Sequence, residues 1–181
     1  MPMFPPQVHR SHLTPLRFLQ RSASVFREKP AVVYGNKVWT YPEIAQRVNS
    51  LASALLGAGV SRGDRVAYLV PNIPAMLEGH FAVPLAGAIL VAINTRLSAP
   101  EVRYILEHSG AKILVVDTEL AHLVEPALAH LPDLELVVSV EDIPAGVRLP
   151  GPEHPGNAGG SLRRSSGRGD SRGHQHALVV A

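Results

Sequence analysis

Apolar residues follow two different periods along the first 140 residues of the chain. Four short runs are apolar at nearly every position, and a spacing of three to four residues dominates the segments between them. The runs are DRVAYLV from Asp64, AILVAI from Ala88, KILVVD from Lys112 and LELVVSV from Leu134. Strands of this kind are covered on both faces, as in a parallel sheet. The alternation therefore predicts an α/β fold, with βαβ units on a mainly parallel sheet.

Local signals predict a helix and a hairpin ahead of these units. Thr14-Pro15 is typical of a helix start, because proline fits the first helical turn. Ala31–Tyr34 and Val38–Tyr41 are β-prone runs on either side of Gly35-Asn36. A turn pair of this type joins antiparallel strands. We therefore expect a β-hairpin here.

Two capping boxes mark later helices. Thr40 with Glu43, and Ser98 with Glu101, have the spacing in which each partner satisfies a backbone N–H at a helix start. Each pair predicts the beginning of a helix that packs on the sheet.

Two further helices are predicted with less regular signals. Asn72 is expected to cap a helix that has Pro74 in its first turn and Pro84 near its end, where proline weakens backbone bonding and bends the chain. Residues Glu119–His130 are expected to form the last helix before the final strand.

Composition divides the chain into three parts. Residues 1–12 are a proline-containing leader that we expect to be flexible, and residues 13–150 hold the periodic pattern. Residues 151–181 contain 7 of the 15 glycines and lack a periodic apolar pattern until ALVVA. Such a segment buries too little apolar surface to offset the entropy of ordering it, so disorder is predicted.

Charge and residue types exclude several functions. Residues 1–150 carry 13 Lys+Arg against 13 Asp+Glu, so the body does not predict a nucleic-acid surface.

The chain has no cysteine, which excludes disulfides, cysteine zinc sites and thiol nucleophiles. Its nine histidines lack metal-ligand spacing, and His174 and His176 have no partners for a zinc site. No apolar run approaches the ~20 residues of a membrane-spanning helix, and no secretory signal is evident, so we expect a cytoplasmic protein without a membrane span.

The stretch VPNIPAMLEGHFAVPLAGAILVAINTRLSAPEVRYILEHSGAKILVVD, residues 70–117, resembles the adenylate-forming family of AMP-dependent synthetases and ligases, and within it the fatty acyl-CoA ligase branch. LTPLRFLQRSASVF, KPAVVYGNKVWTYPEIAQRVNSLASAL and GVSRGDRVAYLVPN precede it in the family's usual order. The likeness covers residues 13–140. It implies that residues 13–150 are the N-terminal part of the large adenylate-forming (AMP-binding) domain.

The resemblance also implies a reaction. Family members use ATP and Mg²⁺ to convert a carboxylic acid into an acyl-adenylate, and then transfer the acyl group to coenzyme A. The implied partner is a small carboxylic acid of medium or long chain, and the implied role is fatty acid metabolism. No nucleic acid is expected as a partner.

The family's working groups are missing from the matched part. The phosphate loop that ends in Pro-Lys-Gly, the Thr-Glu pair near the metal, the ribose-binding Asp and the mobile lysine all follow it in the family. The resemblance therefore assigns no catalytic residue and no metal ligand here, and leaves the cofactor-binding residues unknown. It predicts a fragment that is inactive by itself and binds neither ATP, Mg²⁺ nor CoA productively.

The segment SSGRGDSRG, Ser165–Gly173, has several interpretations. It lacks the Thr pair, Pro and Lys of a phosphate loop, no strand precedes it, and Arg168–Asp170 is a chance adhesion tripeptide. A basic RNA-binding tail is one alternative. Another is translation out of frame, since Gly173–Ala177, read one base onward, permits Ala-Thr-Ser, similar to what precedes the family's phosphate loop. Two rival functions remain: a nucleotide-binding α/β module without turnover, and an interaction protein with an RNA-binding tail.

Two residues of the Asn72 helix are candidates for chemistry. His80 is interpreted as a packed or partly exposed core histidine, with a substrate-facing role as the alternative. Glu78 is expected on an exposed side of the helix, solvated rather than acting as a general base.

Four polar residues lie in predicted loops. Asn94 and Arg96 follow a strand, where parallel sheets place ligand contacts, and ordinary loop anchoring is the alternative. Arg62 and Arg65 flank Gly63-Asp64 and are expected to form a solvated corner.

Overall fold

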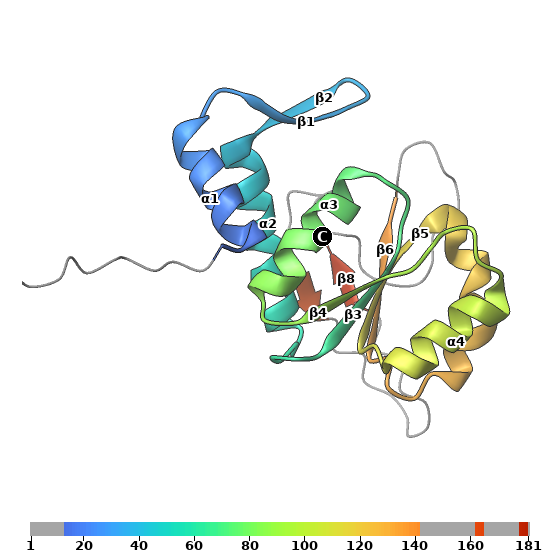
Figure 1. Cartoon of the computed structure of the whole chain (residues 1–181). Helices are drawn as coiled ribbons and strands as arrows, with labels where there is room; N and C mark the ends of the chain where they lie inside the picture. Colours follow the sequence, from blue (N-terminus) through green and yellow to red (C-terminus); the bar gives the residue numbers. More distant parts are fainter. Residues whose placement is uncertain (1–12, 142–161, 165–177, 181) are drawn as a thin grey trace, which may run out of the picture.

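A four-stranded parallel sheet forms the centre of the computed structural model, which describes residues 13–141, 162–164 and 178–180 (Figure 1). Its strands are β3 (Arg65–Leu69), β4 (Ile89–Ala92), β5 (Ile113–Asp117) and β6 (Leu136–Val140). The spatial order is β4-β3-β5-β6, and all neighbouring pairs are parallel. The predicted α/β fold with a parallel sheet is confirmed.

One face of the sheet packs against α2 (Tyr41–Gly57) and α3 (Pro74–Leu85). Val66 and Tyr68 of β3 point to this face and are completely buried. Helix α1 (Pro15–Val25) lies outside α2 and adds Leu19 to the same core. We call this cluster of buried residues from α1, α2, α3 and one face of the sheet the first core.

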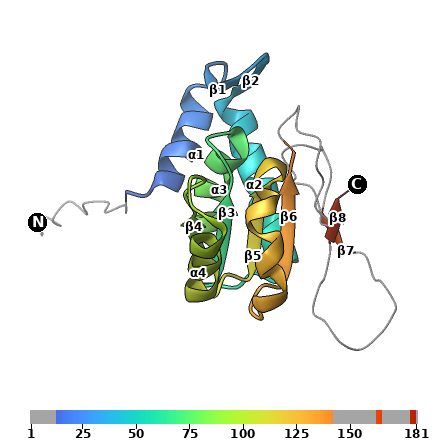
Figure 2. The same cartoon turned by 90° about the vertical axis from the view of Figure 1, so that its right-hand side faces the viewer.

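The opposite face packs against α4 (Ala99–Ser109) and two short 3₁₀ helices, η1 (Thr118–Leu123) and η2 (Glu125–His130). Ala67 and Leu69 alternate with the residues above and point to this second core. Figure 1 shows the sheet between α2 and α3 on one side and α4 on the other, and Figure 2 turns the α4 side towards the viewer. Consecutive apolar residues are explained because each strand faces a helical layer on both sides.

The predicted hairpin and capping boxes are confirmed. Strands β1 (Pro30–Tyr34) and β2 (Lys37–Thr40) pair antiparallel through a turn at Gly35, whose φ is 58°. The backbone N–H of Thr40 donates to Glu43 Oε2 at 2.7 Å, and the N–H of Ser98 donates to Glu101 Oε2 at 2.8 Å. These bonds satisfy donors at the starts of α2 and α4.

The start of α3 corrects the assignment of Asn72 as a cap. The N-cap of α3 is Ile73, with φ −109° and ψ 168°, and no side chain bonds to the helix start there. Proline at position 74 imposes an extended backbone on the residue directly before it, so the helix boundary falls one residue later than expected. Pro84 lies inside the last turn, and the helix ends at Leu85.

The helix expected over Glu119–His130 is two 3₁₀ segments instead. Val124 donates to the Ala121 carbonyl at 2.9 Å, which is a bond to the third residue back. Pro126 has no N–H and cannot continue an α-helical ladder through this region. The chain therefore forms two 3₁₀ helices that are separated at Val124.

Most of the tail and the leader lie outside the described residues. These include residues 1–12, all of Ser165–Gly173, and His174 and His176. Within residues 151–181 the structure describes β7 (Leu162–Arg164) paired antiparallel with β8 (Leu178–Val180). The prediction that no strand precedes Ser165–Gly173 is therefore wrong, because β7 ends directly before Ser165. The predicted disorder of the tail and its out-of-frame origin stay predictions.

The close approach of α3 to β3 depends on Gly79. A Cβ atom built on Gly79 would lie 2.6 Å from Cε1 of Tyr68, whose ring is completely buried. Real Cβ contacts are not this short, so either the ring or the helix would have to move. The ring is a rigid group held in a packed core, and it cannot shift cheaply.

We expect Gly79→Ala to lower the free energy of unfolding by about 1–3 kcal/mol, because overpacking the core outweighs the better helix propensity of alanine. Gly57→Ala is the matched control, since a Cβ on Gly57 in α2 meets nothing within 4 Å. It should be neutral or slightly stabilising. Urea denaturation of both variants measures the difference, and equal effects would contradict the packing argument.

Candidate functional site

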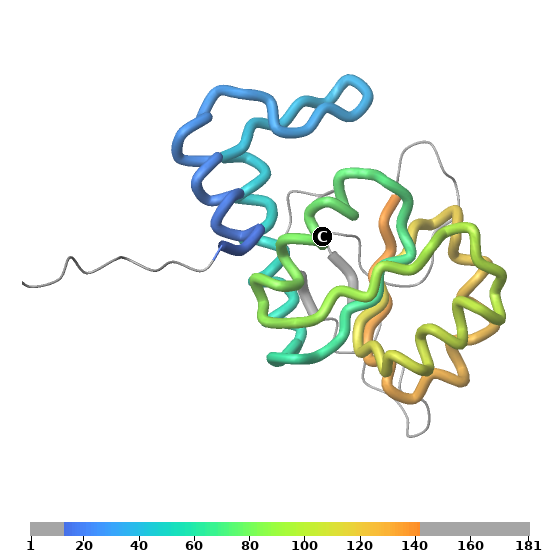
Figure 3. The backbone as a smooth tube through the Cα atoms, viewed as in Figure 1, coloured from blue at the N-terminus to red at the C-terminus, as the bar shows by residue number. Residues whose placement is uncertain are grey.

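The connections of β3 and β5 diverge at the carboxyl edge of the sheet. Strand β3 leads through α3 to β4 on one side, whereas β5 leads through η1 and η2 to β6 on the other. The chain passes from β4 through α4 across to β5, as the trace in Figure 3 shows. Open α/β sheets bind ligands in the crevice that such a divergence leaves between neighbouring strands. The candidate site therefore lies beyond the ends of β3 and β5.

Asp117 and Thr118 supply buried polar groups at this edge. Each is only 2% exposed, and Asp117 Oδ1 accepts a hydrogen bond from the N–H of Glu119 at 2.9 Å. Thr118 Oγ1 has no hydrogen-bond partner among the described residues. The sequence interpretation missed both residues, although a polar residue ending the apolar run KILVVD was an available signal.

The predicted edge residues from the other strands are exposed. Asn72 follows β3, and Asn94 and Arg96 follow β4. Asn94 Oδ1 accepts a hydrogen bond from the N–H of Arg96 at 3.0 Å, which anchors the loop locally. The edge thus carries amide, hydroxyl, carboxylate and guanidinium groups that follow three neighbouring strands.

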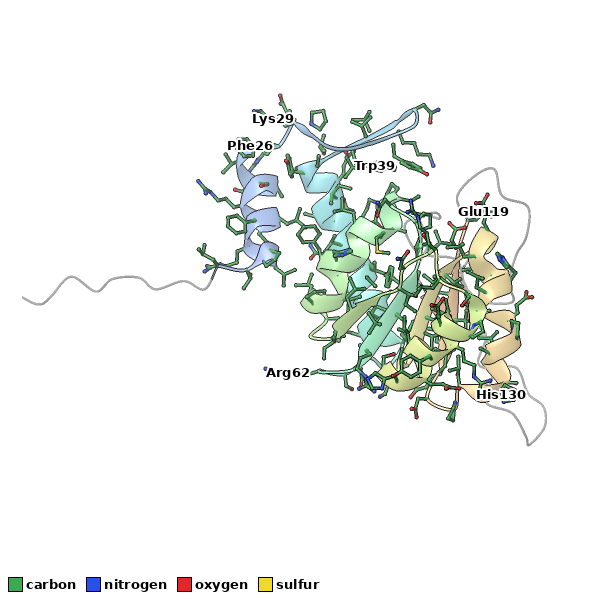
Figure 4. The ribbon with its side chains drawn as sticks, turned by 45° about the vertical axis from the view of Figure 1, so that its right-hand side comes forward. Phe26, Lys29, Trp39, Arg62, Glu119 and His130 are labelled. Carbon is green, nitrogen blue, oxygen red and sulfur yellow. The ribbon has the colours of Figure 1, made fainter. Side chains whose placement is uncertain are left out.

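All three lysines of the chain lie elsewhere. Lys29 lies 5.0 Å from the ring centroid of Phe26 beyond α1, where Figure 4 shows both side chains. Lys37 begins β2 of the hairpin. Lys112 precedes β5 at the amino edge and pairs with Asp64 at 3.0 Å. No lysine is therefore available at the carboxyl edge to neutralise a phosphate.

The expected solvated corner of Arg62 and Arg65 is wrong for Arg65. Its Nε donates to the Ser109 carbonyl and its Nη2 to the Gly110 carbonyl, both at 2.6 Å. A cation at the C-terminal end of α4 stabilises the unpaired carbonyls and the helix dipole. Arg62 is exposed, and Figure 4 shows it at the end of the sheet opposite Glu119.

Glu78 also differs from its expected exposed position. The side chain is 1% exposed on the inner side of α3, and its Oε1 accepts from Nε of Arg47 in α2 at 2.6 Å. The Arg47 guanidinium in turn lies 5.2 Å from the centroid of the Trp39 ring. Helical periodicity alone did not reveal this, because α3 is apolar on most sides and Glu78 faces a cation from another helix.

Burial sets the protonation behaviour of this cluster. Burial raises the pKa of Glu78, and the charge of Arg47 opposes that rise. Burial also raises the pKa of Tyr68, and the neighbouring Glu78 carboxylate raises it further. Tyr68 Oη has no hydrogen-bond partner among the described residues. The cluster holds α2 to α3 inside the first core.

His80 lies beside an apolar groove of about 600 Å³ between the hairpin and the start of α3. Its side chain is exposed, and Nδ1 lies 2.8 Å from the Met76 carbonyl. Because a carbonyl only accepts, Nδ1 carries the proton in this contact. The interpretation as a core histidine is therefore wrong, and Tyr34 also lines the groove.

A smaller pocket of about 270 Å³ lies at the end of α4, beside His130 and Asp133. In the described ranges, no three His, Cys, Asp or Glu side chains come close enough together to hold a metal ion. The described residues thus offer hydrogen-bonding groups at the carboxyl edge and an apolar groove, and neither forms an assembled catalytic group.

Comparison with known proteins identifies the class. Residues 19–167 match the model of the AMP-binding enzyme family. A crystal structure of an anthranilate CoA ligase in complex with anthranoyl-AMP superposes with a TM-score of 0.68 at 32% identity, over 72% of this chain and 25% of that one. The fold is that of adenylate-forming enzymes, and the chain belongs to the AMP-binding enzyme family. The resemblance inferred from the sequence is confirmed.

The relatives are ligases of small acids. A peroxisomal butyrate–CoA ligase of Arabidopsis thaliana is 42% identical over 120 residues, which are 66% of this chain and 21% of the relative. A 4-hydroxybutyrate–CoA ligase of Metallosphaera sedula is 42% identical over 133 residues, 74% of this chain and 23% of the relative. The chain spans about a fifth to a quarter of the curated relatives it matches. Through the described part, no helix has the length and apolar character to cross a membrane.

The Arg47–Glu78 pair generates a pH-dependent prediction. We expect Arg47→Met to lower the free energy of unfolding by about 3–5 kcal/mol near neutral pH, because a buried carboxylate loses its cation. The raised pKa of Glu78 means that the folded state binds more protons than the unfolded state, so stability falls as pH rises. Without Arg47 that pKa rises further, and the loss should shrink at about pH 5 and grow towards about pH 7.

The matched control is Arg103→Met, which removes the exposed pair that Arg103 forms with Glu107 at 2.7 Å in α4. It should change stability by no more than about 0.5 kcal/mol at either pH, because exposed pairs contribute little. Urea denaturation across the pH range measures both variants. A loss in Arg47→Met that does not change with pH would contradict a buried, charged Glu78.

Proposed function

We propose that this chain is a scaffold section of a carboxylate–CoA ligase and does not activate a carboxylate by itself. The observation that carries the proposal is the carboxyl edge of the sheet. Asp117 and Thr118 lie there, and the three lysines of the chain are held at other places by Phe26, by the hairpin and by Asp64. The edge has the position of a ligand site, and Arg96 after β4 is an exposed cation there, but no lysine of the chain lies at it.

Adenylation brings several negative charges together. A carboxylate attacks the α-phosphate of ATP, and pyrophosphate leaves with additional charge. Such a transition state is stabilised by cations and preorganised donors close to the phosphates. A buried carboxylate such as Asp117 would repel these groups unless other parts supplied compensating charge. We infer that ATP, Mg²⁺ and CoA are bound by groups outside these 181 residues.

The relatives support a small carboxylic acid as the substrate of the complete ligase. Their names specify butyrate, 4-hydroxybutyrate and anthranilate, which differ in length and in ring content. We therefore propose an acid of this general size, with medium or longer acyl chains of fatty acid metabolism as the narrower expectation. The cytoplasmic location stays a prediction, since the Arabidopsis relative is named peroxisomal.

The purified chain should release no pyrophosphate above background when incubated with ATP, Mg²⁺, CoA and acetate, butyrate, octanoate or benzoate in turn. The reason is that no lysine reaches the carboxyl edge and the sequence has no Pro-Lys-Gly. A coupled pyrophosphate assay is the measurement. The butyrate–CoA ligase of Arabidopsis thaliana, assayed in parallel with butyrate, is the positive control.

Turnover by the chain alone would overturn the proposal. Calorimetric titration with ATP and Mg²⁺ separates the scaffold from a nucleotide-binding module, because saturable binding without pyrophosphate release would favour the module. Circular dichroism of the same sample establishes that an inactive preparation is folded.

A further inference from the structure

The proposed function assigns no role to the apolar groove of about 600 Å³ beside the hairpin. It is lined by Pro15 at the start of α1, by residues 32–34 of β1, and by residues 72–74, 76–77 and 80–81 around the start of α3. Two of its apolar side chains remain strongly exposed, Val33 at 67% and Leu77 at 38%. A contiguous exposed apolar surface of this kind favours a binding partner.

The chemistry of the groove favours a proline-rich peptide. Tyr34 and Phe81 are the aromatic side chains among its lining residues. Aromatic-lined grooves bind proline-rich segments, which are already extended in the polyproline II conformation and lose little entropy on docking. Such segments present carbonyls and few N–H groups. The exposed amide of Asn72 at the groove can donate to a carbonyl of this type.

The chain carries a segment of this composition next to the groove. Residues 1–12 read MPMFPPQVHRSH, with three prolines and the apolar side chains Met3, Phe4 and Val8. They join the described part at Leu13, two residues before Pro15, which lines the groove. Twelve extended residues reach up to about 40 Å. A short tether also keeps the segment at an effective concentration of about millimolar.

We propose that residues 1–12 dock in the groove between the hairpin and α3, with Phe4 and the prolines around it against Tyr34 and Phe81. The leader then covers apolar surface of α3 and the hairpin, and holds the hairpin onto the first core. This inference rests on the groove and on the leader that adjoins it. It does not depend on whether the chain is a ligase scaffold.

The chain has no cysteine, so one engineered pair can report docking without interference. Gln7→Cys is combined with Leu77→Cys, which places the second thiol in the groove. The matched control combines Gln7→Cys with Phe18→Cys. Phe18 is 55% exposed on α1, lies outside the groove and is closer to Gln7 along the chain, so an undocked leader would reach it at least as easily.

We expect the intramolecular disulfide to form about tenfold faster in the Leu77→Cys chain than in the Phe18→Cys chain, because docking raises the local thiol concentration. Adding Phe4→Ala to the Leu77→Cys chain should remove most of this preference. Mass spectrometry and non-reducing gels follow the reaction, and circular dichroism verifies that each variant is folded.

Equal rates in the two chains would overturn the proposal, as would a preference that Phe4→Ala leaves unchanged. Disulfide-linked dimers whose yield rises with protein concentration would show that the groove takes a second copy of the chain instead. A concentration-independent monomeric product with Leu77→Cys is the result that supports docking of the leader.

Discussion

Strand β3 is buried on both faces, and the positions of the surrounding helices depend on this burial. Its residues Val66 to Leu69 have no exposed surface. One set of side chains meets α2 and α3, and the alternate set meets α4 and the 3₁₀ helices. Helix α3 comes especially close because Gly79 has no side chain above the Tyr68 ring. Burial of β3 on both faces therefore fixes the helices around it, and with them the position of the carboxyl edge of the sheet.

Charged groups inside this framework act on structure rather than on a ligand. Arg65 bonds to the last carbonyls of α4, and Arg47 bonds to the buried Glu78 between α2 and α3. A buried ion pair adds little net stability relative to apolar residues, but removing one partner leaves an uncompensated charge. Both arginines thus fix how helices pack on the sheet.

The fold provides the position of a ligand site, whereas the chemistry at that site depends on the groups that reach it. The divergence of β3 and β5 creates the position of a ligand crevice, and Asp117 and Thr118 give it polarity. Neither Asp117 nor Thr118 supplies the cation that phosphate chemistry needs. Membership of the AMP-binding enzyme family agrees with a section that supports such a site and shares it with other parts of a ligase.

The sequence predicted several elements whose stabilising contacts lie between residues close together in the chain. The parallel strands, the hairpin at Gly35 and the two capping boxes could be predicted because each depends on residues a few positions apart. The burial of Glu78, the bonds of Arg65 and the hydroxyl of Thr118 could not, since their surroundings come from residues 31 to 45 positions away or from the packing of a whole sheet edge. The sequence by itself determined the family and most of the elements, but not the 3₁₀ segments at Thr118–His130. Only the tertiary structure decided which polar side chains are buried, because desolvation and ion pairing depend on neighbours that the chain meets after folding.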